Sequence, residues 1–255
     1  MTRPQVSVGP AAQSRRDRQT STPQLASSID VASSPGSENV RHGRRRQGSG
    51  AVLGAVNAIR TMILRHELMP GEQLRQTDLA GQLDMSRIPI REALTMLAAA
   101  GLATHQLNVG YFVAKLQAAD LDQIYRMRRA IETELLLGVR TPDEAELLNL
   151  RASNSRVVDA LRRNDSDAQI MENRQFHFAI FELANLPLVL AEASRLWSMS
   201  EPYQMLLSGD PDALTRVTSA HERILEALIS GDTGKLIRAS DEHREHTRSQ
   251  VVLLD

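Results

Sequence analysis

Two arginines, Arg87 and Arg91, have the type and spacing that suit contact with a nucleic acid. They lie four positions apart, so on a helix they share one face. Ser86 is a suitable N-cap for that helix, and Pro89 falls in its first turn, where the missing N–H costs no hydrogen bond. A guanidinium group on such a face can bond O6 and N7 of guanine in a DNA major groove. The alternative is an ordinary surface helix with two solvated arginines.

Three histidines on three different expected helices form the second group of residues that could do chemistry. His177, His221 and His243 each lie on or beside the apolar stripe of their helix, and Asn173 lies on the same face as His177, four residues earlier. Imidazoles that converge in a helical core can hold a divalent cation with an open coordination position. The alternative is that each is a core histidine hydrogen-bonded to a neighbour.

The segments around the two arginines predict a winged helix-turn-helix. Thr77 is expected to cap a short helix, and Asp84 and Met85 form a tight connection from it to the arginine helix. Gly110 lies near the tip of an expected hairpin. In chain order the expected elements are an amphipathic helix from about Val52 to Leu68, a helix over 77–83, the arginine helix ending at Gly101, and strands at 102–105 and 111–114.

From Lys115 onward the pattern is helical only. Asp120, Thr141 and Asp165 are expected N-caps, and Pro142 is suited to the first position of a helix. The helices are expected at about 120–137, 141–163, 165–184, 188–207, 211–229 and 234–252. The predicted fold class is therefore mainly α, with an N-terminal winged helix-turn-helix joined to an all-α antiparallel helical bundle.

Composition limits the classes of protein that this chain can be. The 255 residues are enough for two domains, and no apolar run or signal-peptide pattern indicates a membrane or secreted protein. The absence of cysteine excludes disulfides and thiolate metal sites, and it agrees with a cytoplasmic location. A metal would have to be held by histidine, asparagine or a carboxylate.

Charge and composition divide the chain into three segments. Residues 1–49 are rich in serine, proline and arginine, and we expect a disordered basic tail. Residues 50–115 are the expected DNA-binding domain, and residues 116–255 the expected effector-binding and dimerisation domain. The last segment carries most of the acidic residues, so the half that must approach phosphate is the less acidic one.

Residues 51–115 resemble the DNA-binding domain of the GntR family of bacterial transcription regulators. The resemblance implies that the arginine helix enters the major groove and that the wing, with Gly110 at its tip, approaches the minor groove. Asp84 departs from the family pattern, which usually has glycine there, but aspartate tolerates unusual backbone angles. The matching residues are Leu68 to Leu74, Leu79-Ala80, Ser86 to Leu94, Leu97, Gly101-Leu102 and Gly110. We assign the DNA-binding surface to Thr77, Ser86, Arg87, Arg91 and Gly110.

Residues 120–248 resemble the FCD effector domain of the FadR-type branch of that family. The resemblance implies a divalent metal, such as zinc, nickel or manganese, held by Asn173, His177, His221 and His243. At the position of Asn173 some members of the family have aspartate. Because the asparagine carbonyl is neutral, the metal site here would carry more positive charge than a site with aspartate. The resemblance also implies that an open metal position takes a small carboxylate beside an arginine. We assign that arginine to Arg128, whose alternative role is a surface ion pair with Glu132. The matching stretches are Arg128 to Glu132, Phe176-His177, Ala220 to Glu222, Ala227-Leu228 and Glu242-His243.

These expectations converge on a non-enzymatic, ligand-responsive bacterial transcription regulator. We expect a homodimer that binds double-stranded operator DNA, represses transcription, and is released by a small organic acid. A metal-dependent hydrolase with a DNA-binding appendage is a second hypothesis. It lacks a well-placed carboxylate base, because Glu172 points about 100° away from Asn173 around the helix. A metal sensor, for which the metal itself is the signal, is a third.

Overall fold

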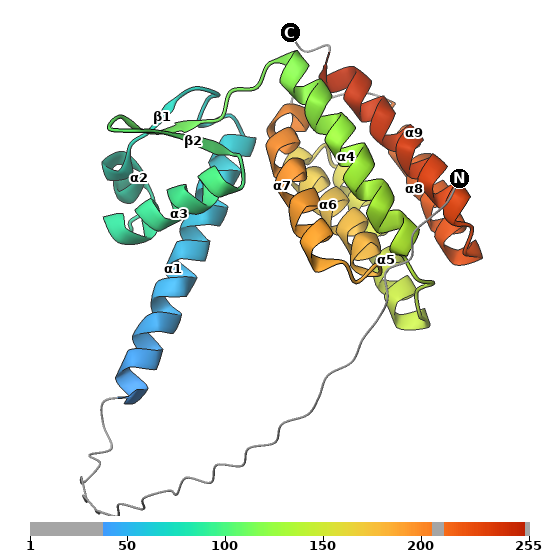
Figure 1. The fold of residues 1–255 in the computed structure, drawn as a ribbon, viewed down its shortest axis with the longest axis horizontal. Coiled ribbons are helices and arrows are strands. Elements are labelled where there is room, and N and C mark those ends of the chain that lie inside the picture. The colour runs from blue at the N-terminus through green and yellow to red at the C-terminus, as the bar shows by residue number, and fades with distance from the viewer. Residues whose placement is uncertain (1–37, 206–211, 253–255) are drawn as a thin grey trace, which may run out of the picture. The chain divides into compact units, whose positions relative to one another are not determined.

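The computed structural model of the chain describes residues 38–205 and 212–252. Figure 1 shows how their helices and strands follow one another. The N-terminal elements are α1 (Glu38–Leu64), β1 (Gln73–Leu74), α2 (Gln76–Gln82), α3 (Arg87–Ala99), β2 (Ala103–Gln106) and β3 (Gly110–Val113). Six helices follow within the described residues: α4 (Ala118–Gly138), α5 (Glu144–Arg162), α6 (Ser166–Glu182), α7 (Pro187–Gln204), α8 (Ala213–Ser230) and α9 (Thr233–Val251). This arrangement confirms the predicted fold class.

Helix α1 differs from the expectation at both of its ends. It begins at Glu38, so it includes residues 38–49 of the expected tail; residues 1–37 lie outside the described residues. Arginine and glutamine are good helix formers, and extending a helix costs far less than starting one. The helix ends at Leu64, before the expected Leu68, because His66 adopts a left-handed conformation with φ of 55°.

Helices α2 and α3 form the predicted helix-turn-helix. The N-cap of α2 is Arg75, so the assignment of Thr77 as the cap is wrong. The exposed Thr77 hydroxyl lies inside the first turn and bonds the carboxylate of Asp78 at 2.9 Å. Asp84 has φ of 50°, which confirms that it takes the unusual backbone angle expected of the turn. Ser86 is the N-cap of α3, as predicted, and the buried residues of α3 are Ile90, Ala93, Leu94 and Leu97.

The three strands form one antiparallel sheet in the order β1–β3–β2. In the wing, Ala103 pairs with Val113 and Gln106 with Gly110, close to the predicted strands. The pairing of Gln73 with Phe112 adds β1, which the sequence did not predict because two residues are too short to show a period. The wing therefore grows from a sheet that is anchored ahead of the helix-turn-helix.

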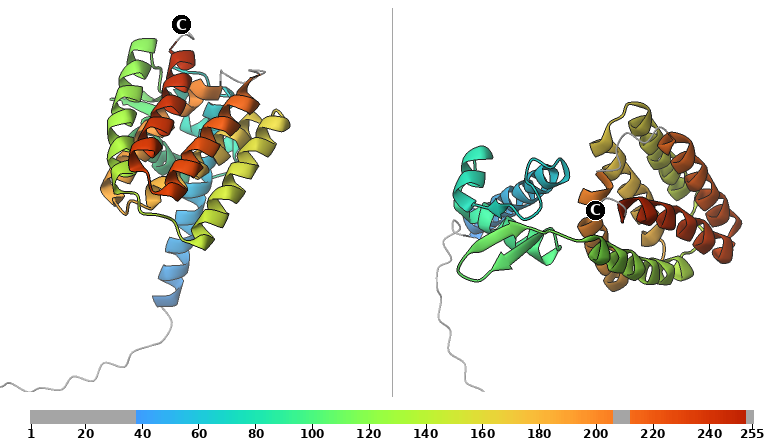
Figure 2. Two further views of the ribbon diagram at one scale, coloured as in Figure 1. Left: turned by 90° about the vertical axis from the view of Figure 1, so that its right-hand side faces the viewer. Right: turned by 90° about the horizontal axis from the view of Figure 1, so that it is seen from above.

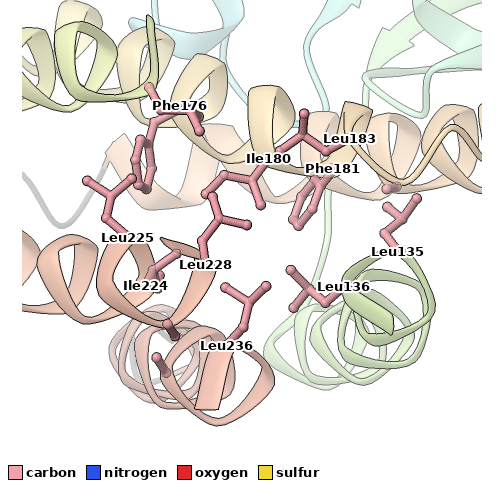
Figure 3. Close-up of a cluster of buried hydrophobic side chains, with 14 of the residues drawn as sticks. Leu135, Leu136, Phe176, Ile180, Phe181, Leu183, Ile224, Leu225, Leu228 and Leu236 are labelled. Carbon is pink, nitrogen blue, oxygen red and sulfur yellow. The ribbon is translucent and has the colours of Figure 1, made fainter. Parts of the chain in front are cut away.

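Helices α4 to α9 enclose one apolar core. Figure 2 shows α4, α9 and α8 side by side, and α8 and α9 are antiparallel across the turn at Gly231. None of the described helices is long and apolar enough to cross a membrane. Figure 3 shows the core side chains, among them Phe176, Ile180 and Phe181 of α6, Ile224, Leu225 and Leu228 of α8, Leu136 of α4 and Leu236 of α9.

Two of the expected N-caps in the bundle do not cap their helices. Asp120 is not the N-cap of α4 but lies in its first turn, where its carboxylate accepts the backbone N–H of Gln117 at 3.0 Å. Asp143, not Thr141, caps α5, because its carboxylate accepts a backbone N–H of the first turn at 2.8 Å. Asp165 caps α6 as predicted. An aspartate near a helix start can satisfy backbone donors from several positions, and local pattern does not choose among them.

Candidate DNA-binding surface and metal site

Helix α3 has one exposed polar face and one buried face. The side chains of Arg87 and Arg91 are exposed, whereas Ile90 and Leu94 on the opposite side are fully buried. Within residues 38–205 and 212–252, neither guanidinium makes an ion pair. The Ser86 hydroxyl makes no capping hydrogen bond. The N-terminal part of α3 thus presents two unpaired cations and a hydroxyl, as a helix that reads a major groove requires.

The wing is connected to α3 by a hydrogen bond of 3.1 Å between the hydroxyls of Thr95 and Tyr111. Gly110 has φ of 126°, which side chains rarely tolerate, so this position favours glycine. Leu107 and Val109, at the wing tip, are 80% and 56% exposed. The sequence reading overlooked this apolar tip, whose signal was the lack of any lysine or arginine between β2 and β3.

Three helices of the bundle bring the predicted histidines together. His177 comes from α6, His221 from α8 and His243 from α9, and one ligand atom from each lies within 4.8 Å of the others. The ring centroids of the three pairs are 5.0 to 5.1 Å apart. Phe176 stacks on His221 at 4.2 Å and so helps to hold that ring in place.

Two ring nitrogens of this histidine cluster lack a hydrogen-bond partner among the described residues, and a metal ion could bind them. His221 Nδ1 lies 2.8 Å from Oδ1 of Asn154, which fixes the proton on Nδ1 and leaves the lone pair of Nε2 directed elsewhere. The Nε2 atoms of His177 and His221 are buried and have no hydrogen-bond partner among the described residues. A buried polar atom without a partner is costly, and a divalent cation would satisfy both nitrogens. The histidines therefore fit a metal better than they fit ordinary core packing.

The electrostatic setting favours neutral imidazoles. Burial lowers the pKa of His177 and His221 well below the usual value, and the neighbouring histidines lower it further. Burial, with the nearby guanidinium groups of Arg128 and Arg244, lowers the pKa of His243 to about 4. Neutral imidazole is the ligating form, so the cluster is ready for a cation at neutral pH.

Asn173 lies one turn before His177 and is half-buried. Together with His177 and His243 it lines a small enclosed cavity of about 20 Å³. A cavity of this size holds about one water molecule or one ion. The structure thus places Asn173 at the same cavity as two of the histidines with which the sequence grouped it.

Arg128 is buried in α4, and its guanidinium lines the same enclosed cavity. Its Nε donates to Glu132 at 2.8 Å and its Nη1 donates to the Ser200 hydroxyl at 3.1 Å. Its guanidinium carbon lies 4.0 Å from the centroid of the Trp197 ring. The ion pair with Glu132 is therefore present, but it is buried, which corrects the expectation of a surface pair.

Glu132 is shared by two arginines, and the sequence reading did not find this arrangement. Its carboxylate also accepts from Arg244 Nε at 2.9 Å and from Trp197 Nε1 at 2.8 Å. Burial disfavours the charged form of Glu132, but the guanidinium groups of Arg128 and Arg244 outweigh burial and hold its pKa below the usual value. This carboxylate is thus an anion committed to its partners, and a general base would need to be free of them.

A second buried carboxylate joins α1 to the bundle. Glu201 of α7 is 1% exposed and accepts hydrogen bonds from Arg60 of α1 and from Arg174 of α6. Glu201 directly follows Ser200, and Arg174 directly follows Asn173. Two of the three helices that hold this bridge, α6 and α7, therefore also line the cavity beside the histidines.

Comparison with protein families gives two matches. Residues 51–113 match the family described as bacterial regulatory proteins, gntR family, and residues 123–246 match the FCD domain. The first range contains α3 and the wing, and the second contains Arg128 and all three histidines.

Curated relatives agree with these matches. An uncharacterised HTH-type transcriptional regulator of Agrobacterium vitis is 33% identical over 133 residues, which cover 51% of this chain and 78% of that protein. The HTH-type transcriptional repressor GlaR of Escherichia coli is 25% identical over 203 residues, covering 75% and 90% of the two chains. The matches to the first three relatives span between 58% and 78% of those proteins' lengths.

A solved structure shows the same fold. The structure of E. coli McbR/YncC aligns with a TM-score of 0.71 at 23% identity, covering 79% of this chain and 96% of that one.

Proposed function

The chain belongs to the GntR family of bacterial regulatory proteins, in the branch that carries an FCD domain, and from this premise we propose a repressor released from its operator by an organic acid. DNA binding and transcription regulation follow from family membership. The repressor role is proposed because GlaR, one of the relatives, is named a repressor. The metal, the effector and the dimer are further parts of the proposal.

We assign operator binding to residues 50–115 and effector binding with dimerisation to residues 116–255. Residues 1–49 would be a basic tail, of which 38–49 continue α1. One winged domain presents only two exposed arginines on α3 and can read few base pairs. A homodimer doubles the site, so we expect an inverted repeat in double-stranded DNA within the cytoplasm. Footprinting that shows an asymmetric site occupied by one chain would contradict this assignment.

The metal site is proposed from the three converging histidines, of which His177 and His221 are buried and His243 is half-buried, and from the two Nε2 atoms without partners among the described residues. Asn173 would supply a neutral oxygen, and Asn154 would hold His221 in the ligating tautomer. A bound divalent metal would supply a Lewis-acidic position that takes an oxygen ligand. Elemental analysis should find about one zinc, nickel or manganese ion per chain.

Arg128 is the proposed contact for the effector carboxylate. Its Nη2 makes no hydrogen bond with the described residues, so one donor remains after Glu132 and Ser200 are satisfied. An added carboxylate beside this donor would compete with Glu132 for the guanidinium. Arg128→Lys keeps the charge and loses the planar fork, so it should weaken carboxylate binding without changing operator affinity in its absence. Equal binding of carboxylates to wild type and variant by calorimetry would reject this assignment.

The proposed route from pocket to operator runs along α7. Ser200 accepts from Arg128 in the pocket, and the next residue, Glu201, accepts from Arg60 of α1. An effector that draws Arg128 away from Ser200 would shift the same turn of α7 that holds α1. Ligand and operator must then have unequal affinities for two arrangements of this turn.

The observation that carries this proposal is the convergence of three histidines, two of them buried, in the domain that follows the exposed arginine helix. The deciding experiment measures release of the metal-loaded protein from its own promoter DNA by small carboxylates. His177→Ala should abolish both metal binding and release but leave binding of free protein to DNA intact. Retained release in that variant would reject the pocket as the effector site.

A metal sensor is the second candidate, and the size of the enclosed cavity favours it. A metal ion fits this cavity of about 20 Å³ as it stands, whereas a carboxylate at Arg128 requires Arg128 to move away from Ser200. If the metal alone releases the protein from DNA at concentrations near its dissociation constant, and carboxylates do not increase this release, the metal is the signal.

A further inference from the structure

A larger cavity of about 970 Å³ adjoins the enclosed one, between α5, α6, α8 and α9. Four side chains line both cavities: Asn173, Gln204, His243 and Thr247. These four residues therefore form the partition between the two spaces. A metal held by His243 and Asn173 would lie at this partition and could offer its open position to the larger cavity.

The lining of the outer cavity is of two kinds. It includes apolar side chains of three helices, among them Ile170, Val217 and Ala220. It also includes three arginines, Arg162, Arg216 and Arg223, whereas Glu242 is the one acidic residue among the described residues that line it. The outer cavity therefore combines an apolar wall with an excess of positive charge.

Two of these arginines have only exposed partners. Arg162 lies 3.4 Å from Asp159. Arg223 lies 3.8 Å from Glu242 and donates from Nη1 to the Ser219 hydroxyl at 3.0 Å, and both arginine side chains are at least half exposed. Exposed pairs of this kind contribute little, so either side chain can turn toward an anion at small cost. The volume of the cavity is also of the size that binds an entire small organic ligand.

We propose that the outer cavity binds the body of the effector, and that the effector is an elongated acid with an anionic group at each end. One carboxylate would take the open metal position at the partition. An apolar spacer would lie along Ile170 and Val217, and the second anion would contact Arg162 and Arg223. This inference rests on the proposed metal site, and it narrows the proposed small organic acid to a dicarboxylate.

The test is a calorimetric series on the full, zinc-loaded chain. The probes are malonate, succinate, glutarate, adipate and suberate, each compared with the monocarboxylate of the same carbon number. At least one dicarboxylate should bind roughly tenfold to a hundredfold more tightly than its matched monocarboxylate, as expected for an added charged contact. If no dicarboxylate is preferred, the inference is wrong.

Variants separate the outer cavity from the metal. The double variant Arg162→Ala, Arg223→Ala should lose the preference for dicarboxylates while its affinity for acetate stays unchanged. Arg151→Ala, an exposed arginine earlier on α5, is the matched control and should keep the preference. Val217→Phe should exclude long acids and admit acetate. A double variant that keeps the preference would overturn the assignment.

The outcomes also distinguish this inference from the proposed function. If acetate binds to the zinc-loaded protein and chain length has no effect, the metal site stands and the outer cavity is not the ligand site. If no carboxylate binds to the zinc-loaded protein at all, both the proposed effector class and this inference are wrong.

Discussion

The molecule uses arginine in two opposite ways, on α3 and in the pocket of the bundle. On α3, Arg87 and Arg91 are exposed and make no ion pair within the described residues. In the bundle, Arg128 and Arg244 are buried and share the carboxylate of Glu132. The same side chain is thus exposed without an ion pair in one region and paired with a buried carboxylate in the other. Substitutions should therefore reduce DNA affinity in the first region and stability in the second.

Removing the shared carboxylate should have the largest effect. Glu132→Ala leaves two buried guanidinium groups without their anion, and loss of one partner of a buried pair costs about 3–5 kcal/mol of unfolding free energy. Denaturant titration measures this loss. Glu192→Ala is the matched control, because Glu192 pairs with Arg195 at the surface and its loss should cost under about 1 kcal/mol. Equal losses of unfolding free energy in the two variants would show that the buried pairs of Glu132 stabilise the fold no more than a surface pair does.

The same carboxylate predicts how stability depends on pH. The pKa of Glu132 is lower in the folded chain than the reference value of 4.5 for the unfolded chain. Its contribution is therefore complete above that value and is lost as pH falls through the folded-state pKa. Glu132→Gln should show a flatter decline of unfolding free energy than wild type on acidification below about pH 4.5. An identical slope would show that folding does not lower the pKa of Glu132.

Zinc should stabilise the bundle by a smaller amount. A ligand at a hundredfold excess over its dissociation constant adds about 2.7 kcal/mol to unfolding free energy. His221→Ala should abolish this gain. Asn154→Ala should weaken zinc binding about 10- to 100-fold, because His221 then loses the hydrogen bond that keeps its proton on Nδ1. His105→Ala, in the wing, is the control and should keep the full gain. A gain that survives in His221→Ala would move the metal away from the histidine cluster.

In the exposed region the effect should fall on affinity alone. Arg87→Ala and Arg91→Ala should each cost about 1–3 kcal/mol of operator binding if they read bases, and under about 0.5 kcal/mol of stability. Arg126→Ala, an arginine of α4 whose side chain is 74% exposed, should change neither quantity. Normal operator affinity of Arg87→Ala would remove α3 from the DNA-binding surface.

The smallest effect concerns the link between α3 and the wing. Tyr111→Phe removes the hydrogen bond to Thr95 and should cost about 0.5–1.5 kcal/mol, at the low end because the bond is exposed. The loss should appear in operator affinity, because the wing then loses its fixed position beside α3. Tyr203→Phe, which loses a bond to the backbone N–H of Leu116 instead, should leave the wing in place.

Local signals explain which parts of the structure the sequence could predict. Ser86, Pro89 and the apolar spacing of α3 act within one or two turns, so the start and the buried face of that helix were predictable. The start of α5 was not, because Thr141 and Asp143 both suit an N-cap and only the backbone geometry selects Asp143. The start of α1 was not either, since a polar arginine-rich segment has no apolar period even when it is helical.

The residues of the candidate site also divide into those that the sequence could predict and those that it could not. The three histidines could be grouped because each lies on an inward stripe of its own helix. The pairing of Glu132 with Arg244 joins residues 112 positions apart, and nothing in the local sequence indicates such a contact. Asn154 was missed for the same reason, because its partner His221 is on another helix. Side-chain partners from distant segments need the packed structure to be seen.

The bridge at Glu201 also limits the order in which this sequence can change over generations. Arg60 or Arg174 can be lost singly, because the buried carboxylate keeps one cationic partner. Loss of Glu201 first would leave two guanidinium groups facing each other with no anion between them. A lineage that replaces this bridge by apolar contacts would therefore change an arginine first and the glutamate last. Descendants should more often carry a lone glutamate with one arginine than two arginines without the glutamate.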